Sequence, residues 1–291
     1  MPSRVAVVGI FAFWLLATGF VAYRDVWPRL FSSGPPPVTI ELADEARQNI
    51  PARWTLSRNG QKIGKLTTQM KYHDANDSFQ FTYRYTNLSL QLGEITFATP
   101  DAVSDVWMTR AGNLKEQSMT GKLKVSHSGT ELVDGTIDIR GVVTSGMLTG
   151  HAKLKTNFGN LEGDLDPVPV PEGQPLNPLQ PVNRLGNVQG GQKWLVHKSD
   201  PLSDAVQQLI DKKLAEVGFR RPKEEPKGSL VAQVDSSPRN LDWKGESVPC
   251  WVIEYRYAEP IARTWVRVSD GKVLRQEAFE KGESLMFERE D

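Results

Sequence analysis

This chain has almost no cysteine and no excess of either charge, and each lack excludes a class of protein. Its 291 residues contain one cysteine, Cys250, so no disulfide can form within the chain. Lysine plus arginine equal aspartate plus glutamate at 35 each, so the balance gives no electrostatic signal for nucleic acid. We therefore exclude a small disulfide-stapled scaffold and expect no nucleic-acid partner.

The motifs of common catalytic and cofactor sites are also missing. There is no G-x-G-x-x-G, no G-x-x-x-x-G-K-[S/T] and no G-x-S-x-G sequence, which removes the usual signals of nucleotide binding and serine hydrolysis. The four histidines are isolated in sequence and form neither H-E-x-x-H nor H-x-H. We assign no catalytic, cofactor-binding or metal-binding residue, and we expect no cofactor.

A hydrophobic run long enough to cross a membrane occurs once, at the N-terminus. Residues 5–23 are nineteen uncharged positions, flanked by Arg4 and Arg24. A helix of that length spans about 28 Å, close to the hydrocarbon thickness of a bilayer. We predict a signal-anchor transmembrane helix within residues 1–24 that makes a single pass. A cleaved signal peptide and a buried core helix are the alternatives, but the run is long for a signal h-region and no Ala-x-Ala triplet follows it.

The residues beside this run indicate where the remainder of the chain lies. Arg4 and the N-terminal amine favour a cytoplasmic N-terminus, although Arg24 and Arg29 reduce the charge asymmetry. Residues 25–37 end in Ser-Ser-Gly-Pro-Pro-Pro and predict a stiff, proline-rich stalk. We therefore expect residues 38–291 to form an extracytoplasmic domain of the bacterial cell envelope.

From residue 38 onward the dominant hydrophobic period is two, which predicts β-strands. If the two aromatic stripes of this region face one concavity, a curved sheet could enclose an apolar ligand such as an acyl chain; the alternative is that they form the core. The candidate ligand-facing or core residues are Phe79, Phe81, Tyr83, Tyr85, Trp251, Ile253, Tyr255 and Tyr257. After Tyr85 the alternation changes parity, so Asn87 is predicted to mark a bulge or bend.

Turn signals join the predicted strands. Asn-Gly at 59–60 predicts a two-residue hairpin that pairs Leu56 with Ile63. Further turns are predicted at 111–113, 128–129, 134–135, 145–146 and 270–271, the last pairing Val268 with Val273. Strands joined by short turns are antiparallel neighbours. The predicted fold is mainly β, a curved, half-barrel-like antiparallel sheet with one packed helix, plus the N-terminal transmembrane helix.

Two segments interrupt the β pattern. Residues 166–191 contain six prolines and are either a linker between two β halves or a strap packed across one sheet. The strap is favoured by its apolar residues, Leu176, Leu179, Val182 and Leu185. Residues 201–217 predict an amphipathic helix capped by Asp200, with Leu209, Ile210 and Leu214 buried against the sheet.

Three polar clusters have a functional and a plainer interpretation. The alternating residues Asn160, Glu162, Asp164 and Asp166 suggest a calcium site, or the charged face of an edge strand. The plainer interpretation is favoured, because strand spacing spreads these side chains too far apart to converge on one ion.

The other clusters contain histidine. His73 with Asp74 and Asp77 suggests an acid–base pair, but Asp and Asn in this segment favour a polar turn. Ser126 and His127 would point to opposite faces of a strand and so would not converge. Cys250 is predicted to be a small buried hydrophobic residue, with a reactive thiol as the alternative.

Two segments carry a family resemblance. Residues 53–64, Arg-Trp-Thr-Leu-Ser-Arg-Asn-Gly-Gln-Lys-Ile-Gly, resemble the opening hairpin of uncharacterised bacterial envelope proteins with a curved antiparallel sheet. Residues 264–277, Thr-Trp-Val-Arg-Val-Ser-Asp-Gly-Lys-Val-Leu-Arg-Gln-Glu, resemble their closing hairpin. The resemblance implies a shape similar to lipoprotein-carrier folds, in which helices cover a half-open barrel. It supplies no functional residue.

The sequence thus predicts a membrane-anchored, extracytoplasmic β domain and favours a binding protein over an enzyme. The expected partners are the membrane, through residues 5–23, and either an apolar ligand or an envelope protein. The alternative is a membrane-tethered hydrolase whose carboxylates and histidine are brought together by the fold. A histidine and acidic residues converging in a cleft would favour the hydrolase, and a purely apolar concave face would favour the binding protein.

Overall fold

The computed structural model describes residues 50–110, 112–170, 180–196, 200–216, 230–280 and 282–291, together with Trp14, Ala17 and Thr18. The predicted stalk at 25–37 lies outside these residues, and so does the predicted anchor at 5–23 apart from those three, which are helical. Within the described part of the chain, no helix has both the length and the apolar character needed to cross a membrane.

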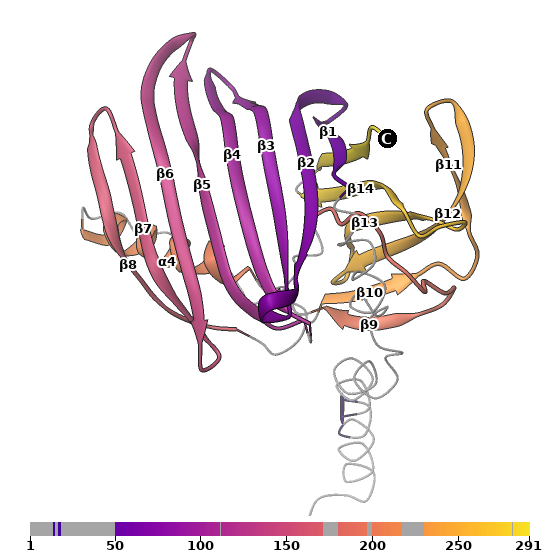
Figure 1. The fold of residues 1–291 in the computed structure, drawn as a ribbon. Helices are drawn as coiled ribbons and strands as arrows, with labels where there is room; N and C mark the ends of the chain where they lie inside the picture. The colour runs from indigo at the N-terminus through magenta and orange to yellow at the C-terminus, as the bar shows by residue number, and fades with distance from the viewer. Residues whose placement is uncertain are drawn as a thin grey trace, which may run out of the picture.

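The described residues form one antiparallel sheet of 15 strands that does not close on itself (Figure 1). The first eight strands follow one another as neighbours: β1 (Ala52–Arg58), β2 (Gln61–His73), β3 (Ser78–Leu92), β4 (Ile95–Thr109), β5 (Leu114–His127), β6 (Thr130–Thr144), β7 (Met147–Thr156) and β8 (Gly159–Pro169). The remaining strands are β9 (Lys193–Val196), β10 (Leu230–Val234), β11 (Arg239–Trp243), β12 (Glu246–Arg256), β13 (Pro260–Arg267), β14 (Val273–Glu280) and β15 (Glu283–Arg289). The predicted antiparallel sheet is therefore confirmed.

Strand β1 joins the two halves of the sheet. It pairs with β2 on one side and with β15 on the other, so that Trp54 lies between Leu66 and Arg289. From β15 the sheet continues through β14, β13, β12 and β10 to β9, with β11 folded back onto β12. The edges of this path are β8 and β9, and hydrogen bonding between the first and last strands of the chain makes the described residues one structural unit.

Several predicted turns are present, with one change of register. Asn59 and Gly60 have φ of 49° and 80° and form a two-residue turn between the paired residues Arg58 and Gln61. Positive φ at both positions is the requirement that favours Asn-Gly here. A bulge between Leu56 and Ser57 then shifts the register, so Leu56 pairs with Gly64 and not with Ile63 as predicted. The turns at 128–129 and 145–146 also join paired strands, as expected.

One predicted turn is wrong, and another joins its strands in a different register. Asp134 and Gly135 lie inside β6 and pair with β5, because neighbouring strands on both sides outweigh the local turn preference of Asp-Gly. At the C-terminal hairpin Val273 pairs with Val266, not with Val268. The loop is longer than two residues: Lys272 accepts a hydrogen bond from the amide of Arg267, and the amide of Val268 donates to the carbonyl of Pro249 at 3.0 Å.

One face of the sheet, called the inner face from here on, carries the main hydrophobic core. Period-two alternation places the apolar side chains of both halves on this face, and together they form a single cluster that includes Trp54, Leu66 and Phe79 from the first half and Ile253 and Val266 from the second. A sheet of this width can bury one face against itself only by bending, and Figure 1 shows the second half turning away from the plane of β2–β8. A smaller cluster with the buried Cys250 lies elsewhere, as expected for a structural thiol.

Helix α4 (Pro201–Glu216) crosses the inner face of the first half against β8 and β7 (Figure 1). It begins as predicted: the side chain of Asp200 accepts a hydrogen bond from the amide of Ser203 at 3.2 Å. Leu202, Ala205 and Leu209 are buried on its sheet-facing side. The other two residues predicted to be buried on this helix are Ile210 and Leu214. Ile210 is only half-buried, while Val217 and the side chain of Leu214 lie outside the described residues.

The proline-rich stretch predicted over 166–191 begins later than expected, because β8 continues to Pro169. Residues 171–179, and with them Leu176 and Leu179, lie outside the described residues. Beyond them, Pro181 is fully buried, and Val182 and Leu185 pack against the core. The amide of Leu185 donates to the carbonyl of Gly271, so residues 180–185 contact the β13–β14 loop.

Candidate functional site: the inner face beside helix α4

The structure brings the eight predicted ligand-facing or core residues into one cluster. Both aromatic stripes point to the inner face, although they lie on strands far apart in sequence. Five of the eight are buried, namely Phe79, Phe81, Tyr83, Ile253 and Tyr255. Tyr85, Trp251 and Tyr257 are half-buried and pack against them. Strand β12 is buried on both faces at this point, because Cys250 and Val252 on the face opposite the stripe are also buried.

Asn87 explains why the apolar face continues along β3 with opposite parity. Its φ of 51° is left-handed, a conformation that reverses which side of the strand the next residues face. The pairing of β3 with β4 keeps its register across this point, from Thr86–Asp101 to Leu88–Thr99. Leu88 therefore packs against the same core as Tyr83, and the predicted bend is confirmed.

Strand register defines rows of inner-face residues that run across the sheet. One row follows cross-strand pairs from β3 to β8: Tyr85, Ala102, Gly121, Ile137, Leu154 and Leu161. The next row contains Tyr83, Ser104, Met119, Ile139, Ala152 and Gly163. Helix α4 lies on this second row, where a Cβ added at Gly163 would be 3.3 Å from a methyl group of Leu209. Glycine at this position thus lets the helix approach the edge strand.

The inner face stays apolar beyond α4, toward the hairpin turns at 93–94, 128–129 and 157–158. This part of the face is incompletely covered. The residues of this apolar strip are half-buried or exposed, and they lie on six adjacent strands: Leu90, Phe97, Leu123, Val125, Val133, Ile137, Leu154 and Leu161. Phe97 has 38% of its surface exposed. Soluble proteins usually cover contiguous apolar surface, so this strip is a candidate binding surface.

The turns that end the strip add exposed apolar side chains. The amide of Ser128 donates to the carbonyl of Glu94 at 2.9 Å, and the side-chain amide of Asn157 donates to the carbonyl of Leu132 at 3.1 Å. These contacts hold the three turns side by side. Leu132 is exposed near this edge, and Phe158 at the outermost turn is 77% exposed.

Polar groups lie near the start of α4. Gln117 is buried, and its side-chain amide donates to Asp200 at 3.3 Å. Burial, and then the Asp200 carboxylate, raise the pKa of Tyr85 to about 12. Tyr83 is more deeply buried, and desolvation raises the pKa of its hydroxyl further above the ordinary value. Both phenols are therefore neutral hydrogen-bond donors throughout the physiological range.

The acidic stripe of β8 converges on a histidine from the neighbouring strand. Asp164 and Glu162 lie 3.0 and 3.1 Å from the two ring nitrogens of His151, and Glu162 also pairs with Lys153 at 2.7 Å. Hydrogen bonds to Asp164 and then Glu162 raise the pKa of His151. All these side chains lie on the exposed outer face at the sheet edge, which is the charged edge strand that the sequence predicted. Within the described residues, no group of three or more His, Cys, Asp or Glu side chains could hold a metal ion.

The other two histidine clusters form structural contacts. Residues Asp74–Asn76 form a short 3-10 turn, and the ring of His73 contacts Gln80 at 3.1 Å and packs 4.6 Å from the ring of Trp107. His127 pairs with Glu94 at 3.3 Å across the adjacent hairpin turns. The turn predicted from Asp and Asn is confirmed, and His73 alternates with the inner-face residues of β2.

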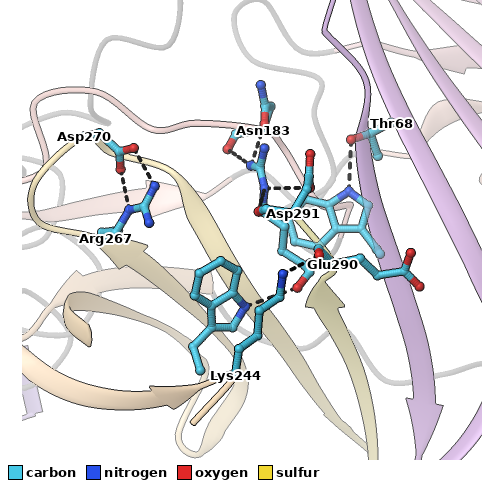
Figure 2. A network of polar contacts seen from close by, with 10 residues as sticks. Thr68, Asn183, Lys244, Arg267, Asp270, Glu290 and Asp291 are labelled. Carbon is cyan, nitrogen blue, oxygen red and sulfur yellow. Dashed lines mark hydrogen bonds and ion pairs between the residues drawn. The ribbon is translucent and has the colours of Figure 1, made fainter. Parts of the chain in front are cut away.

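Sequence reasoning missed a buried arginine at the junction of the two halves. Arg289 is 3% exposed, its guanidinium lies 5.8 Å from the ring centre of Trp54, and it donates to the carbonyl of Asn183 at 3.0 Å and to Asp291 at 3.1 Å. Figure 2 shows Asn183 and Asp291 on either side of this network. No local pattern marks the site, because its members come from β1, the segment after residue 179 and the C-terminus.

Comparison with known proteins found similarity only among solved structures. No family model and no curated protein matches this chain. A solved structure described as a beta-barrel-like protein of domain of unknown function DUF1849 from Brucella abortus is similar over 82% of this chain and 94% of its own, with 11% identity and a TM-score of 0.33. The resemblance to lipoprotein carriers that the hairpins suggested stays a prediction.

Proposed function

We propose that this protein is a membrane-anchored, extracytoplasmic binding domain that holds an apolar ligand on its inner face. The observation that carries the proposal is the apolar strip beside α4. Its residues lie on the core side of six strands, yet they remain half-buried or exposed because helix α4 does not extend over them. In this arrangement the curved sheet acts as a half-open barrel, and the helix closes only part of its face.

The energetics suit a hydrocarbon ligand. Burial of apolar surface stabilises by about 25 cal/mol per Å², or about 0.8 kcal/mol for each methylene group. An acyl chain lying on the strip would bury its own methylenes and the exposed parts of side chains such as Phe97 and Leu154 at once. An apolar segment of an envelope protein would use the same surface and is the second class of ligand.

The alternative, a tethered hydrolase, is best represented by His151 with Glu162 and Asp164, because this is the described histidine that contacts two carboxylates. A general base needs a ring nitrogen with a free lone pair. Both ring nitrogens of His151 face carboxylates, which favour the protonated imidazolium. The cluster is also exposed on the outer face, away from the apolar strip. The binding function is therefore the better supported of the two.

A fluorescent apolar dye, 1-N-phenylnaphthylamine, tests the proposal. We expect saturable binding to the purified protein and displacement by monolauroylglycerol. Phe97→Ser in the strip should weaken dye binding several-fold. Val142→Ser is the matched control, because Val142 has 43% of its surface exposed but faces away from the core. No saturable binding, or equal loss in both variants, would contradict the proposal, whereas binding that only an apolar peptide displaces would favour a protein partner.

A further inference from the structure

The hydroxyl of Tyr83 is a buried donor without a partner. Tyr83 is 1% exposed, and its hydroxyl has no hydrogen-bond partner among the residues that the structure describes. Leaving such a group unpaired costs free energy, and native proteins rarely do so without a reason. Two other buried polar side chains of the inner face have partners: the indole of Trp54 donates to Thr68 at 3.0 Å, and Tyr255 hydrogen-bonds to Thr264.

The position of Tyr83 connects this hydroxyl with the apolar strip. Tyr83 and Tyr85 are two residues apart on β3 and share the inner face. Tyr85 is half-buried and belongs to the first row on the strip side of α4, the row that continues to Ile137 and Leu154. The two phenols thus form the polar end of an otherwise apolar surface.

The length of this surface matches one acyl chain. From Tyr85 to Leu90 along β3 the distance is about 17 Å, at about 3.3 Å per residue of strand. An acyl chain occupies one leaflet of a bilayer, about half of the roughly 30 Å hydrocarbon core. A chain with its polar end at the phenols would therefore reach the hairpin turns near Phe97.

The charge beside the phenols determines which polar group of a ligand can bind there. Asp200 lies at the start of α4, where it accepts hydrogen bonds from Gln117 and from the amide of Ser203. A ligand carboxylate at this point would be repelled, whereas a neutral carbonyl would accept hydrogen bonds from the phenols without that penalty.

We propose that Tyr83 and Tyr85 hold the ester carbonyl of a neutral, single-chain acyl lipid whose hydrocarbon chain lies along the apolar strip. This inference rests on the proposed binding of an apolar ligand and names its chemical class. It assigns Tyr83 and Tyr85 as binding residues, with Tyr83 as the donor that the ligand satisfies. Free fatty acids, which present a carboxylate near Asp200, should bind less tightly than esters of the same chain length.

Calorimetric titration with two twelve-carbon probes tests the ligand class. We expect monolauroylglycerol to bind at least about tenfold more tightly than dodecanoate at about pH 8, a pH at which the carboxylate is ionised. Asp200→Asn should reduce this preference by improving dodecanoate binding. If both probes bind equally well, the ester assignment is wrong while the proposed function survives. If neither probe binds, the proposed function itself fails.

Tyr83→Phe tests the donor, and Tyr255→Phe is its matched control. Tyr83→Phe should weaken monolauroylglycerol binding about five- to tenfold, the effect of one lost hydrogen bond. Without ligand, the same variant should keep or raise the melting temperature, because it removes an unpaired buried hydroxyl. Tyr255→Phe loses a hydrogen bond to Thr264 and should lower the melting temperature without changing the affinity. Unchanged affinity in Tyr83→Phe, or destabilisation matching that of Tyr255→Phe, would overturn the proposal.

Discussion

At the scale of single residues, the fold depends on a few polar side chains that local sequence does not identify. Arg289 is the main example. It occupies an inner-face position of the last strand, where an apolar residue would be expected, and it connects β1 with residues 180–185 and the C-terminus. Its aliphatic stem can pack in the core while its guanidinium reaches polar partners, a property that lysine shares less well.

Replacing this arginine should therefore be costly. We expect Arg289→Met to lower the free energy of unfolding by about 2–3 kcal/mol, because it leaves the carbonyl of Asn183 without its charged donor. Arg140→Met removes an exposed ion pair with Glu116 and should cost less than about 1 kcal/mol. Urea unfolding followed by tryptophan fluorescence measures both. Equal effects in the two variants would show that burial of Arg289 gives it no special role.

A second residue, Asp270, makes the free energy of unfolding depend on pH in acid. Asp270 accepts two hydrogen bonds from the guanidinium of Arg267, at 2.8 and 2.6 Å, and these bonds lower its pKa to about 2. Figure 2 shows this pair facing each other across the β13–β14 loop. Because the folded-state pKa is below the unfolded value of about 3.9, the contribution is complete above about pH 4 and is lost as the pH falls toward 2.

Asp270→Asn should remove this dependence. The difference in unfolding free energy between the natural protein and the variant should be largest above about pH 4 and should shrink as the pH falls to about 2. Urea unfolding at a series of pH values measures the difference. The natural protein should show the steeper loss in acid; parallel pH profiles would mean that the Arg267–Asp270 pair does not stabilise the folded state.

At the scale of elements, helix α4 decides how much of the inner face is covered. The helix is amphipathic as the sequence predicts. Its position on the sheet depends on one contact, in which the buried side chain of Leu209 packs against Gly163 of β8. The acidic residues of β8 alternate with these inner-face positions and remain exposed, although Asp166 reaches the helix and pairs with Lys212 at 3.8 Å. One strand therefore supports the helix on one face and carries a charged edge on the other.

Truncation of Leu209 tests whether α4 is a fixed part of the core or a mobile cover over the inner face. Leu209→Ala should cost about 2–5 kcal/mol, as removal of a buried leucine side chain does. The exposed neighbour Gln208 is the control, and Gln208→Ala should change stability by less than about 0.5 kcal/mol. Thermal unfolding and binding of the apolar dye are measured together. A small loss of stability with increased dye binding would instead indicate a helix that opens over the apolar strip.

At the scale of the whole molecule, the proposed position in the cell depends on residues 5–23, which precede the described sheet. If they form an uncleaved anchor, the intact protein should fractionate with membranes and resist carbonate extraction, because a single apolar helix inserts stably. A chain that begins at Val38 should appear in the soluble fraction. Soluble mature protein whose N-terminus falls between about residues 24 and 38 would instead indicate a cleaved signal peptide.

The sequence by itself determined the local features of this protein. Period-two stripes predicted the strands of β3 and β12, Asn59-Gly60 predicted a hairpin, and Asp200 predicted the start of α4, because each depends on backbone preferences and side-chain alternation within a few residues. The same local reasoning failed at Asp134-Gly135, where pairing on both sides holds the segment in a strand.

Only the tertiary structure decided which residues distant in sequence contact one another. It paired β1 with β15, brought the two aromatic stripes into one core, placed His151 between carboxylates of the next strand and left Tyr83 without a hydrogen-bond partner in the described chain. These contacts join residues separated by ten to more than two hundred positions, and they depend on strand order, register and the bending of the sheet. Local propensities do not encode those quantities, because the free energy that selects them comes from burying one continuous face of the whole sheet.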